Sequence, residues 1–384
     1  MSTMNRTRLW HRFAALPVLA LAAAVLPAPA ATAATATAAA PPEAVLELPE
    51  PGGPYRVGVT DLHLVDRHRA DPWVPERRRE LMVSLWFPAA SRGGTPDRYV
   101  SAAESRAILT EFGMTDVPAD LLSGVRVHAR TGVRPLARPG GWPLVVLSPG
   151  FSQPRSSLTS LAEDLASRGY VVAGVDHTYE AAAVTFPDGR VAGCSVCRLE
   201  EAGKLDQEYL VRGRAQDISF VLDELTRRRT GVRVDADRIA VVGYSVGGAA
   251  AAAAIQRDRR IDAGANIDGT FFPAITKDLG RPFLMIGSDL DRGAANDPTW
   301  AASWAHLTGW RRWLTVTGST HGSFPDYGVI GDQLGLPSPP LSGERATEIT
   351  RQYVAAFAGR HLRHHPSPLL NGPSADYPEV VFER

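Results

Sequence analysis

Two kinds of apolar pattern alternate along the chain. Short continuous apolar runs are typical of strands buried on both faces of a sheet, and they occur at residues 143–147, 170–175, 238–242, 263–267, 282–286 and 313–316. Two further strands, with polar or turn-forming residues around them, are predicted at 55–65 and 80–87. Helical spacing of apolar residues lies between the runs, at 157–168, 205–227, 298–307 and 343–359, and residues 101–113 also look helical. Strands that alternate with helices predict an α/β fold, with a mostly parallel sheet covered by helices on both faces.

The N-terminal segment has a different pattern, that of a secretory signal peptide. Its first twelve residues carry three arginines and no acidic residue, Phe13 to Val25 is apolar, and a run of Ala, Thr and Pro follows. Because the apolar stretch is too short to span a bilayer stably, we interpret residues 1–40 as a signal peptide and cleavage zone. The protein is therefore expected to be secreted, with a Pro/Ala-rich leader at 41–54 and a single domain at 55–384.

Charge and hydropathy narrow the possible partners. Removing residues 1–40 leaves 38 Lys and Arg against 41 Asp and Glu, a net charge of −3, and this balance gives no indication of nucleic-acid binding. No later stretch reaches the roughly 20 apolar residues of a membrane helix. We therefore expect no transmembrane anchor.

The chain has two cysteines, Cys194 and Cys197. In an exported protein the default expectation for such a pair is a disulfide, here one that closes a very short loop. A redox motif of this spacing would need a thioredoxin context, and a zinc site would need two more ligands nearby, so neither is favoured. An Asp-x-Asp fragment at 289–291 matches a calcium loop at only two positions, and no metal or cofactor is expected.

The clearest chemical signal is the run from Arg238 to Gly248. An apolar strand leads into Gly243-Tyr244-Ser245-Val246-Gly247, and an alanine-rich helix follows. This is the pattern of a nucleophile elbow, in which a sharp strand-to-helix turn exposes the serine hydroxyl and glycines permit close approach of the backbone. We therefore predict that Ser245 is a nucleophile.

A serine nucleophile needs a histidine to accept its proton and a carboxylate to orient that histidine. His321 is our prediction for the base because it lies in a loop after the last predicted parallel strand. His306 lies within a predicted helix, and His361, His364 and His365 lie near the end of another. His177 precedes the serine and is interpreted as a structural loop residue.

Two strand ends offer the acid. Asp268 follows the strand at 263–267 directly and precedes a glycine and two phenylalanines. Asp289 and Asp291 follow the next strand, where the acid is commonly found in this kind of fold, and Asp297 is more remote. The local sequence favours Asp268, because residues 289–297 read as a polar loop, whereas position in the fold favours Asp289 or Asp291, and the alternatives stay open.

The tetrahedral intermediate of acyl transfer also needs two backbone N–H groups aimed at its oxyanion. Val246, directly after the nucleophile, is expected to supply one of them. Phe151 is expected to supply the other, since it follows the strand at 143–147 and Gly150 permits an inward turn.

At this point the sequence resembles a known family, the plasma-type platelet-activating-factor acetylhydrolases and their exported bacterial relatives, which are α/β-hydrolases. The matching stretches are Asp71-Pro72-Trp73, Arg79 to Pro88, Ser148 to Phe151, Asp164 to Ala173, Arg212 to Leu225, the elbow, Asp268-Gly269 and Gly318 to His321. The resemblance implies that Asp268 is the acid and His321 the base. It also implies a small acyl group on a phospholipid-like alcohol, with transient contact with a lipid surface.

Together these observations predict a secreted serine carboxylesterase that hydrolyses short-acyl esters of small molecules or lipids. Phe271, Phe272 and Phe324 follow the acid and the histidine closely, so we expect their rings to form the acyl pocket and to favour short chains. A broader lipase or polyester hydrolase remains open. A serine peptidase and a non-catalytic binding protein of the same fold are less favoured, because little chain is left for a cap domain and a pure binder has no need of all three catalytic groups.

Overall fold

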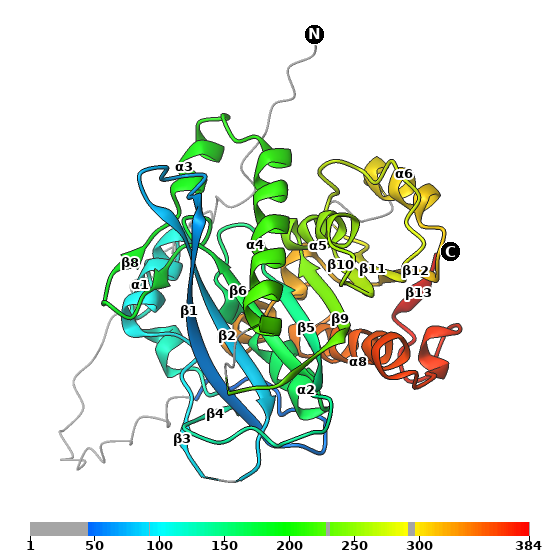
Figure 1. The fold of residues 1–384 in the computed structure, drawn as a ribbon, viewed down its shortest axis with the longest axis horizontal. Helices are drawn as coiled ribbons and strands as arrows, with labels where there is room; N and C mark the ends of the chain where they lie inside the picture. Colours follow the sequence, from blue (N-terminus) through cyan, green and yellow to red (C-terminus); the bar gives the residue numbers. More distant parts are fainter. Residues whose placement is uncertain (1–44, 92, 228–230, 291–295, 384) are drawn as a thin grey trace, which may run out of the picture. The chain divides into compact units, whose positions relative to one another are not determined.

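The computed structural model describes residues 45–91, 93–227, 231–290 and 296–383 (Figure 1). The predicted signal peptide and residues 41–44 of the predicted leader lie outside these ranges. Residues 45–54, which the sequence assigned to the leader, pack against the domain. Leu46 and Leu48 are buried, and their backbones exchange hydrogen bonds with Arg126, at 2.8 Å from Arg126 N to Leu46 O and 3.0 Å from Leu48 N to Arg126 O.

One large sheet organises the described residues. Its spatial order is β13-β12-β11-β10-β9-β5-β6-β2-β1-β4-β3. The six strands from β12 to β6 run parallel, whereas β2 pairs antiparallel with β6 and β1, and β13 pairs antiparallel with β12. The strands of this sheet are β1 (Val57–Ala70), β2 (Arg78–Pro88), β3 (Thr95–Pro96), β4 (Arg130–Thr131), β5 (Trp142–Ser148), β6 (Val171–His177), β9 (Val234–Tyr244), β10 (Ala263–Ile267), β11 (Phe283–Ser288), β12 (Arg311–Val316) and β13 (Val380–Phe382), and β7 (Val184–Thr185) and β8 (Val191–Ala192) form a separate pair.

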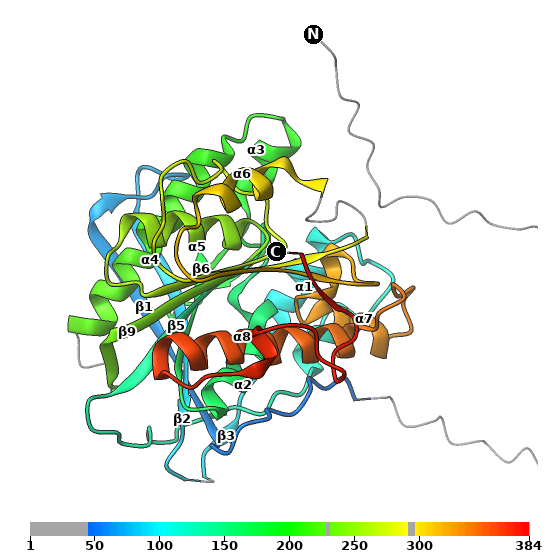
Figure 2. The ribbon, with the colours of Figure 1, turned by 90° about the vertical axis from the view of Figure 1, so that its right-hand side faces the viewer.

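Helices cover both faces of the sheet. Figure 2 shows α4, α5 and α6 on one side and α2 and α8 on the other. The α-helices are α1 (Ala102–Glu111), α2 (Thr159–Ser167), α3 (Ser195–Glu201), α4 (Gln207–Arg227), α5 (Val246–Arg257), α6 (Pro298–His306), α7 (Tyr327–Gln333) and α8 (Gly343–Arg363). Short 3-10 helices lie at η1 (Leu121–Gly124), η2 (Arg155–Leu158), η4 (His321–Ser323) and η5 (Pro368–Leu370). The predicted architecture, a mostly parallel sheet with helices on both faces, is confirmed.

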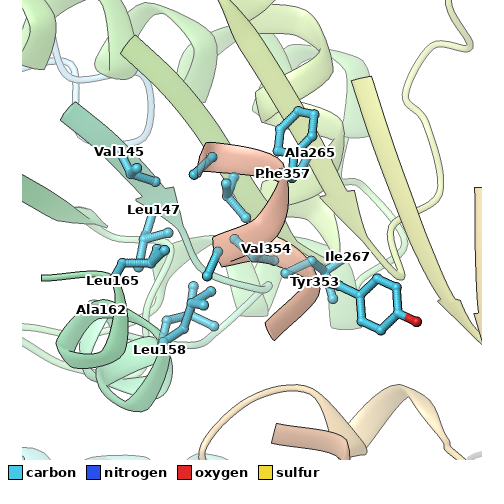
Figure 3. Packing of buried hydrophobic residues seen from close by; sticks show 14 of the residues in the cluster. Val145, Leu147, Leu158, Ala162, Leu165, Ala265, Ile267, Tyr353, Val354 and Phe357 are labelled. Carbon is cyan, nitrogen blue, oxygen red and sulfur yellow. The ribbon is translucent and has the colours of Figure 1, made fainter. Parts of the chain in front are cut away.

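The core has two layers, one on each face of the sheet, because successive side chains of a strand point to opposite faces. In β5, Val145 and Leu147 belong to the layer under α2 and α8, while Leu144 and Val146 belong to the layer under α4, α5 and α6. Figure 3 shows the first layer, in which Val145, Leu147, Ala265 and Ile267 of the sheet face Leu158, Ala162 and Leu165 around α2 and Tyr353, Val354 and Phe357 of α8. Both layers exclude water, so the central strands form a rigid base for the loops at their ends.

The predicted strand at 263–267 has the bounds that the structure gives it, and the other central strands differ by a few residues at their ends. The carboxyl ends of the six parallel strands, from Ser148 in β5 to Val316 in β12, lie along one edge of the sheet. Ligand sites of open α/β sheets lie at this edge. Within the described ranges, no helix combines the length and apolar character needed to span a bilayer.

Candidate active site

Ser245 occupies the sharp bend between β9 and α5. Its backbone has φ 56° and ψ −129°, a conformation that a non-glycine residue adopts only where the surroundings impose it. The flanking glycines explain how the bend is accommodated. A Cβ at Gly243 would lie 1.9 Å from the carbonyl oxygen of Gly247, and a Cβ at Gly247 would lie 2.0 Å from the carbonyl oxygen of Ser148. Any larger residue would push strand, helix and the end of β5 apart.

Asp268 follows β10 directly and also has a positive φ, 53°. The buried side chain of Asn266 holds this turn, because it donates to the carbonyl oxygen of Gly269 at 2.7 Å and accepts from the N–H of Gly269 at 2.9 Å. The carboxylate of Asp268 accepts the N–H of Ser288 at 2.7 Å and the hydroxyl of Ser288 at 3.0 Å. These bonds fix an almost fully buried carboxylate, whose side chain is 7% exposed, in one orientation.

His321 lies in the loop after β12 and joins the other two residues. Its Nδ1 lies 2.7 Å from Oδ2 of Asp268, and its Nε2 lies 3.0 Å from Oγ of Ser245. Tyr244 holds the imidazole of His321 in place. Its ring stacks on the imidazole with centroids 4.9 Å apart, and its hydroxyl donates to the carbonyl oxygen of His321 at 2.7 Å. The structure therefore brings Ser245, His321 and Asp268 into one hydrogen-bonded chain. The imidazole is 46% exposed, so solvent and substrate can reach it.

Two of the other candidate acids, Asp289 and Asp297, accept hydrogen bonds that shape nearby loops and a helix end. Asp289 accepts the backbone N–H of Gly318 at 2.8 Å and thereby shapes the loop that carries His321. Asp297 caps the N-terminus of α6 and accepts the hydroxyl of Thr270 at 2.6 Å. Asp291 lies outside the described residues.

The expected oxyanion donors lie near each other. Val246 is the first residue of α5, where N–H groups have no partner within the helix. The side chains of Val246 and Phe151 belong to one apolar cluster, which also includes Phe272 and Trp73. Among the hydrogen bonds between described residues, none uses the N–H of Phe151.

The three rings expected in the acyl pocket differ in burial. Phe271 is 1% exposed and packs against Phe283 and Trp300, so it belongs to the core layer under α4, α5 and α6. Phe324 is 5% exposed and belongs to the opposite layer. Phe272 alone is half-buried beside Phe151 and Val246. Phe271 and Phe324 therefore pack in the core on opposite faces of the sheet.

His177 has the structural position that the sequence indicated, although it lies at the end of a strand rather than in a loop. It is the last residue of β6, is 1% exposed, and lies between Ser148 and Asp217, with Nε2 3.0 Å from Oγ of Ser148 and Nδ1 2.9 Å from Oδ2 of Asp217. This is a second Ser-His-Asp chain with almost the same distances as the first. Since all three side chains are buried, no substrate can reach the serine, and geometry alone does not make a catalytic group.

Cys194 and Cys197 form the predicted disulfide at the start of α3. Both sulfur-bearing side chains are buried in the cluster that contains Val246. Across the described ranges, no group of three or more His, Cys, Asp or Glu side chains is arranged to hold a metal ion.

Comparison with known proteins connects this arrangement to esterases. The chain matches the family described as platelet-activating factor acetylhydrolase, isoform II, over residues 43–193 and 214–336. It is 28% identical over 369 residues to a probable 1-alkyl-2-acetylglycerophosphocholine esterase of Arthroderma benhamiae, covering 87% of this chain and 93% of the relative. It is 26% identical over 352 residues to the platelet-activating factor acetylhydrolase of Cavia porcellus, covering 82% and 78%.

A solved structure is more similar still. The ferulic acid esterase from Streptomyces cinnamoneus is 45% identical, covers 89% of this chain and 100% of its own, and has a TM-score of 0.80. These relatives are all named as enzymes that cleave carboxylic esters. Their fold is that of the α/β-hydrolases, which the sheet order and the elbow described above share.

Proposed function

This chain belongs to the platelet-activating factor acetylhydrolase, isoform II, family and is a carboxylic ester hydrolase, and we propose that it is a secreted serine esterase that acts through Ser245, His321 and Asp268. The observation that carries the proposal is the continuous chain from Oγ of Ser245 through His321 to Asp268, with links of 3.0 and 2.7 Å. The proposed catalytic unit is a single domain over residues 55–384, exported by the signal peptide at 1–40.

The proposed mechanism follows from the direction of these bonds. Asp268 is an acceptor, so Nδ1 of His321 carries the proton and Nε2 presents a lone pair to the hydroxyl of Ser245. As Oγ bonds to the ester carbonyl carbon, its proton passes to Nε2, and the carbonyl electron pair moves onto oxygen. The N–H groups of Phe151 and Val246 stabilise this oxyanion.

Collapse of the tetrahedral intermediate then breaks the ester C–O bond. The alcohol leaves with the proton from Nε2, and the acyl group stays on Ser245 as an acyl-enzyme. A water molecule repeats the sequence, giving its proton to His321, and releases the carboxylic acid. Asp268 keeps its charge throughout and stabilises the imidazolium that forms twice in each cycle.

We propose short acyl groups as the substrate class, because the relatives in this family are named for acetyl esters. Phe272 is the one pocket ring of the sequence prediction that lies beside the oxyanion donors, and it would limit the length of the acyl chain. Ferulate is a second candidate acyl group, favoured by the 45% identity to a ferulic acid esterase. Its aromatic ring would find Phe151, Phe272 and Trp73 in the cluster around Val246.

One series of substrates tests both the activity and the acyl class. We expect turnover of p-nitrophenyl acetate and butyrate with kcat/KM values well above that for palmitate, since each methylene that does not fit changes the barrier by about 1–3 kcal/mol. Methyl ferulate, measured beside methyl butyrate, decides between the two acyl groups. Equal kcat/KM values from acetate to palmitate would contradict the preference for short acyl chains and would indicate an open lipid- or polymer-binding groove.

A further inference from the structure

A cluster of buried ionic side chains contacts the loop at Ser148–Ser152, which carries the proposed oxyanion donor Phe151. The proposed mechanism at Ser245 gives this cluster no role. Arg79, Arg214, Glu180 and Asp217 are each at most 1% exposed. Arg79 donates to both Asp217 and Glu180, at 2.5 and 3.2 Å, and Arg69 donates to Asp217 from the rim. Burying so many charges is expensive unless each is paired, and such clusters are weak contributors to stability. The cluster also holds backbone, through the contacts of Arg214 with two carbonyl oxygens.

Arg214 of α4 is the member that contacts the loop. Its Nε donates to Oε2 of Glu180 at 2.7 Å, and one terminal nitrogen donates to the carbonyl oxygen of Pro149 at 2.6 Å. The other terminal nitrogen makes a longer contact, 3.5 Å, with the carbonyl oxygen of Gly150. The planar guanidinium thus holds the carbonyl groups of two successive residues, and the bond to Glu180 fixes the orientation of the guanidinium.

The orientation of the Gly150 carbonyl determines that of the Phe151 N–H. Both groups belong to one planar trans peptide unit and point in opposite directions. A guanidinium that holds the oxygen on the side of the buried cluster therefore turns the N–H of Phe151 away from it. Gly150 is also confined from the other side, because a Cβ there would lie 2.9 Å from the ring of Tyr244, the neighbour of Ser245.

The ends of the loop are fixed by the same cluster. After Phe151, the N–H of Ser152 donates to the carbonyl oxygen of Glu180 at 3.1 Å, and the N–H of Ala182 donates to the carbonyl oxygen of Ser152 at 2.8 Å. Before it, the hydroxyl of Ser148 is held by His177. These contacts tie the loop between Ser148 and Ser152 to β6, Glu180 and Arg214, and the N–H of Gln153 adds a hydrogen bond to the carbonyl oxygen of Gly150 at 3.4 Å.

The protonation states of Asp217 and His177 determine which atom donates in the hydrogen bond between His177 and Ser148. Burial raises the pKa of Asp217, but Arg79, His177 and Arg69 outweigh this effect and hold that pKa well below its usual range. Burial, together with the charge of Arg214, lowers the pKa of His177. A neutral His177 donates from Nδ1 to the ionised Asp217, so its Nε2 accepts the hydroxyl proton of Ser148.

From these contacts we infer that Arg214, oriented by Glu180, is a positioning residue that aims the N–H of Phe151 at the oxyanion of the tetrahedral intermediate. Arg214 touches neither substrate nor reacting atoms, and acts through the peptide unit between Gly150 and Phe151. The inference rests on the proposed function, in which Phe151 supplies one of the two oxyanion donors. Its consequence is that removing the guanidinium weakens binding of the transition state more than binding of the substrate.

The test compares Arg214→Gln with Arg351→Gln. Arg351 is a matched control, since it is also buried and donates to one carboxylate, Asp164, and to two carbonyl oxygens, those of Pro49 and Glu50. Each variant is assayed for kcat and KM on p-nitrophenyl butyrate, for melting temperature, and for the inhibition constant of an alkyl trifluoromethyl ketone. Such a ketone forms a hemiketal oxyanion on the nucleophile and thus reports on the oxyanion site.

For Arg214→Gln we expect kcat to fall about 100-fold, near the effect of removing one oxyanion donor, with KM changed by less than about threefold. Affinity for the trifluoromethyl ketone should fall in parallel. Arg351→Gln should lower the melting temperature similarly and keep kcat and inhibitor affinity within about threefold of wild type. Arg214→Lys, which keeps the charge beside Glu180 but lacks the fork, should show an intermediate loss of about tenfold, and it provides the test if Arg214→Gln does not fold.

The inference is overturned if Arg214→Gln, or Arg214→Lys where the former does not fold, matches Arg351→Gln in kcat and in inhibitor affinity. It is also overturned if KM rises while inhibitor affinity is unchanged. Failure of the proposed function looks different, because Ser245→Ala would then keep its activity and the wild-type protein would not be labelled at Ser245 by a fluorophosphonate. If Ser245 is labelled but the Arg214 variants keep the kcat and inhibitor affinity of the Arg351 control, only the positioning role of Arg214 is refuted.

Discussion

Replacing Asp268 by asparagine tests how the acid controls the histidine. The N–H of Ser288 lies 2.7 Å from Oδ1 of Asp268 and needs an acceptor there. In Asp268→Asn the amide oxygen must therefore take the Oδ1 position, which places the amide NH₂ opposite Nδ1 of His321. Because an NH₂ group can only donate, His321 has to present a lone pair at Nδ1 and carry its proton on Nε2. That proton faces Ser245, and His321 can no longer accept the proton of the serine.

The expected decrease in kcat has two causes, the wrong tautomer of His321 and the loss of one negative charge beside it. The corresponding change in a serine protease triad lowers kcat about 10⁴-fold, or about 5.5 kcal/mol at 1.36 kcal/mol for each factor of ten. His321 is 46% exposed, and water screens part of the charge effect, so we expect a decrease of about 10³- to 10⁴-fold in kcat.

Asp289→Asn is the matched control, since it makes the same chemical change one strand away. Its amide oxygen can still accept the N–H of Gly318, and we expect kcat to stay within about tenfold of wild type. Both variants are assayed on p-nitrophenyl butyrate, with melting temperatures to establish folding. A larger loss in Asp289→Asn than in Asp268→Asn would refute the assignment of the acid and the tautomer argument with it.

Three further predictions concern the fold around the site. Burial raises the pKa of Glu163 to about 7, so between about pH 4.5 and 7 the unfolded chain releases a proton that the folded chain keeps, and stability falls as the pH rises through this window. Glu163→Gln should then be more stable than wild type at pH 8, by on the order of 2 kcal/mol in urea unfolding, with no gain near pH 4; an equal gain at both values would contradict this. Replacing Cys194 and Cys197 together by serine should lower the melting temperature by only a few degrees and keep kcat within about threefold, because the closed loop is short; loss of activity in folded protein would show that the disulfide shapes the site. Gly243→Ala should prevent formation of the elbow, since its Cβ would lie 1.9 Å from the carbonyl oxygen of Gly247, and a soluble variant with wild-type kcat would contradict the strain argument.

The central strands and the elbow could be predicted because their signals are local. Strands buried on both faces need continuous apolar runs, so residues 143–147 and 263–267 indicated their structure without knowledge of their neighbours. The glycines around Ser245 form a recognisable five-residue pattern, although the steric requirement is local only for Gly243, since Gly247 faces Ser148 of another strand. Asp268 and His321 were harder, because several acids and histidines follow the elbow. The loop after the last parallel strand indicated His321, whereas the acid was left open between Asp268 and the aspartates after the next strand. The family resemblance indicated Asp268, and in the structure His321 lies within hydrogen-bonding distance of both Asp268 and Ser245.

The buried ionic cluster was missed for a physical reason. Charged residues are exposed by default, and their burial depends on partners that lie far away in sequence, such as Arg79 and Asp217, 138 residues apart. One local signal was available. Arg214 and Asp217 occupy the apolar stripe of α4 between Leu210 and Val221, where a solvated charge does not belong. A charge at a core position of an amphipathic helix indicates a buried partner even when the partner is unknown.

The rings at Phe271 and Phe324 show how little closeness in sequence says about direction. Each ring lies three positions after Asp268 or His321, and that closeness suggested a pocket. Phe271 turns into one core layer and Phe324 into the other. Sequence neighbours of catalytic residues therefore indicate a pocket only when their direction is known.

Ser245, and no other serine, is the nucleophile that we propose. The most direct measurement treats the folded protein with a fluorophosphonate and locates the adduct by peptide mass spectrometry, with Ser245→Ala in parallel. We expect one adduct per chain, at Ser245, with loss of esterase activity in step with labelling, and neither adduct nor turnover in Ser245→Ala. An adduct at Ser148, which has the same hydrogen-bonding pattern in a buried position, or undiminished turnover by Ser245→Ala, would contradict it.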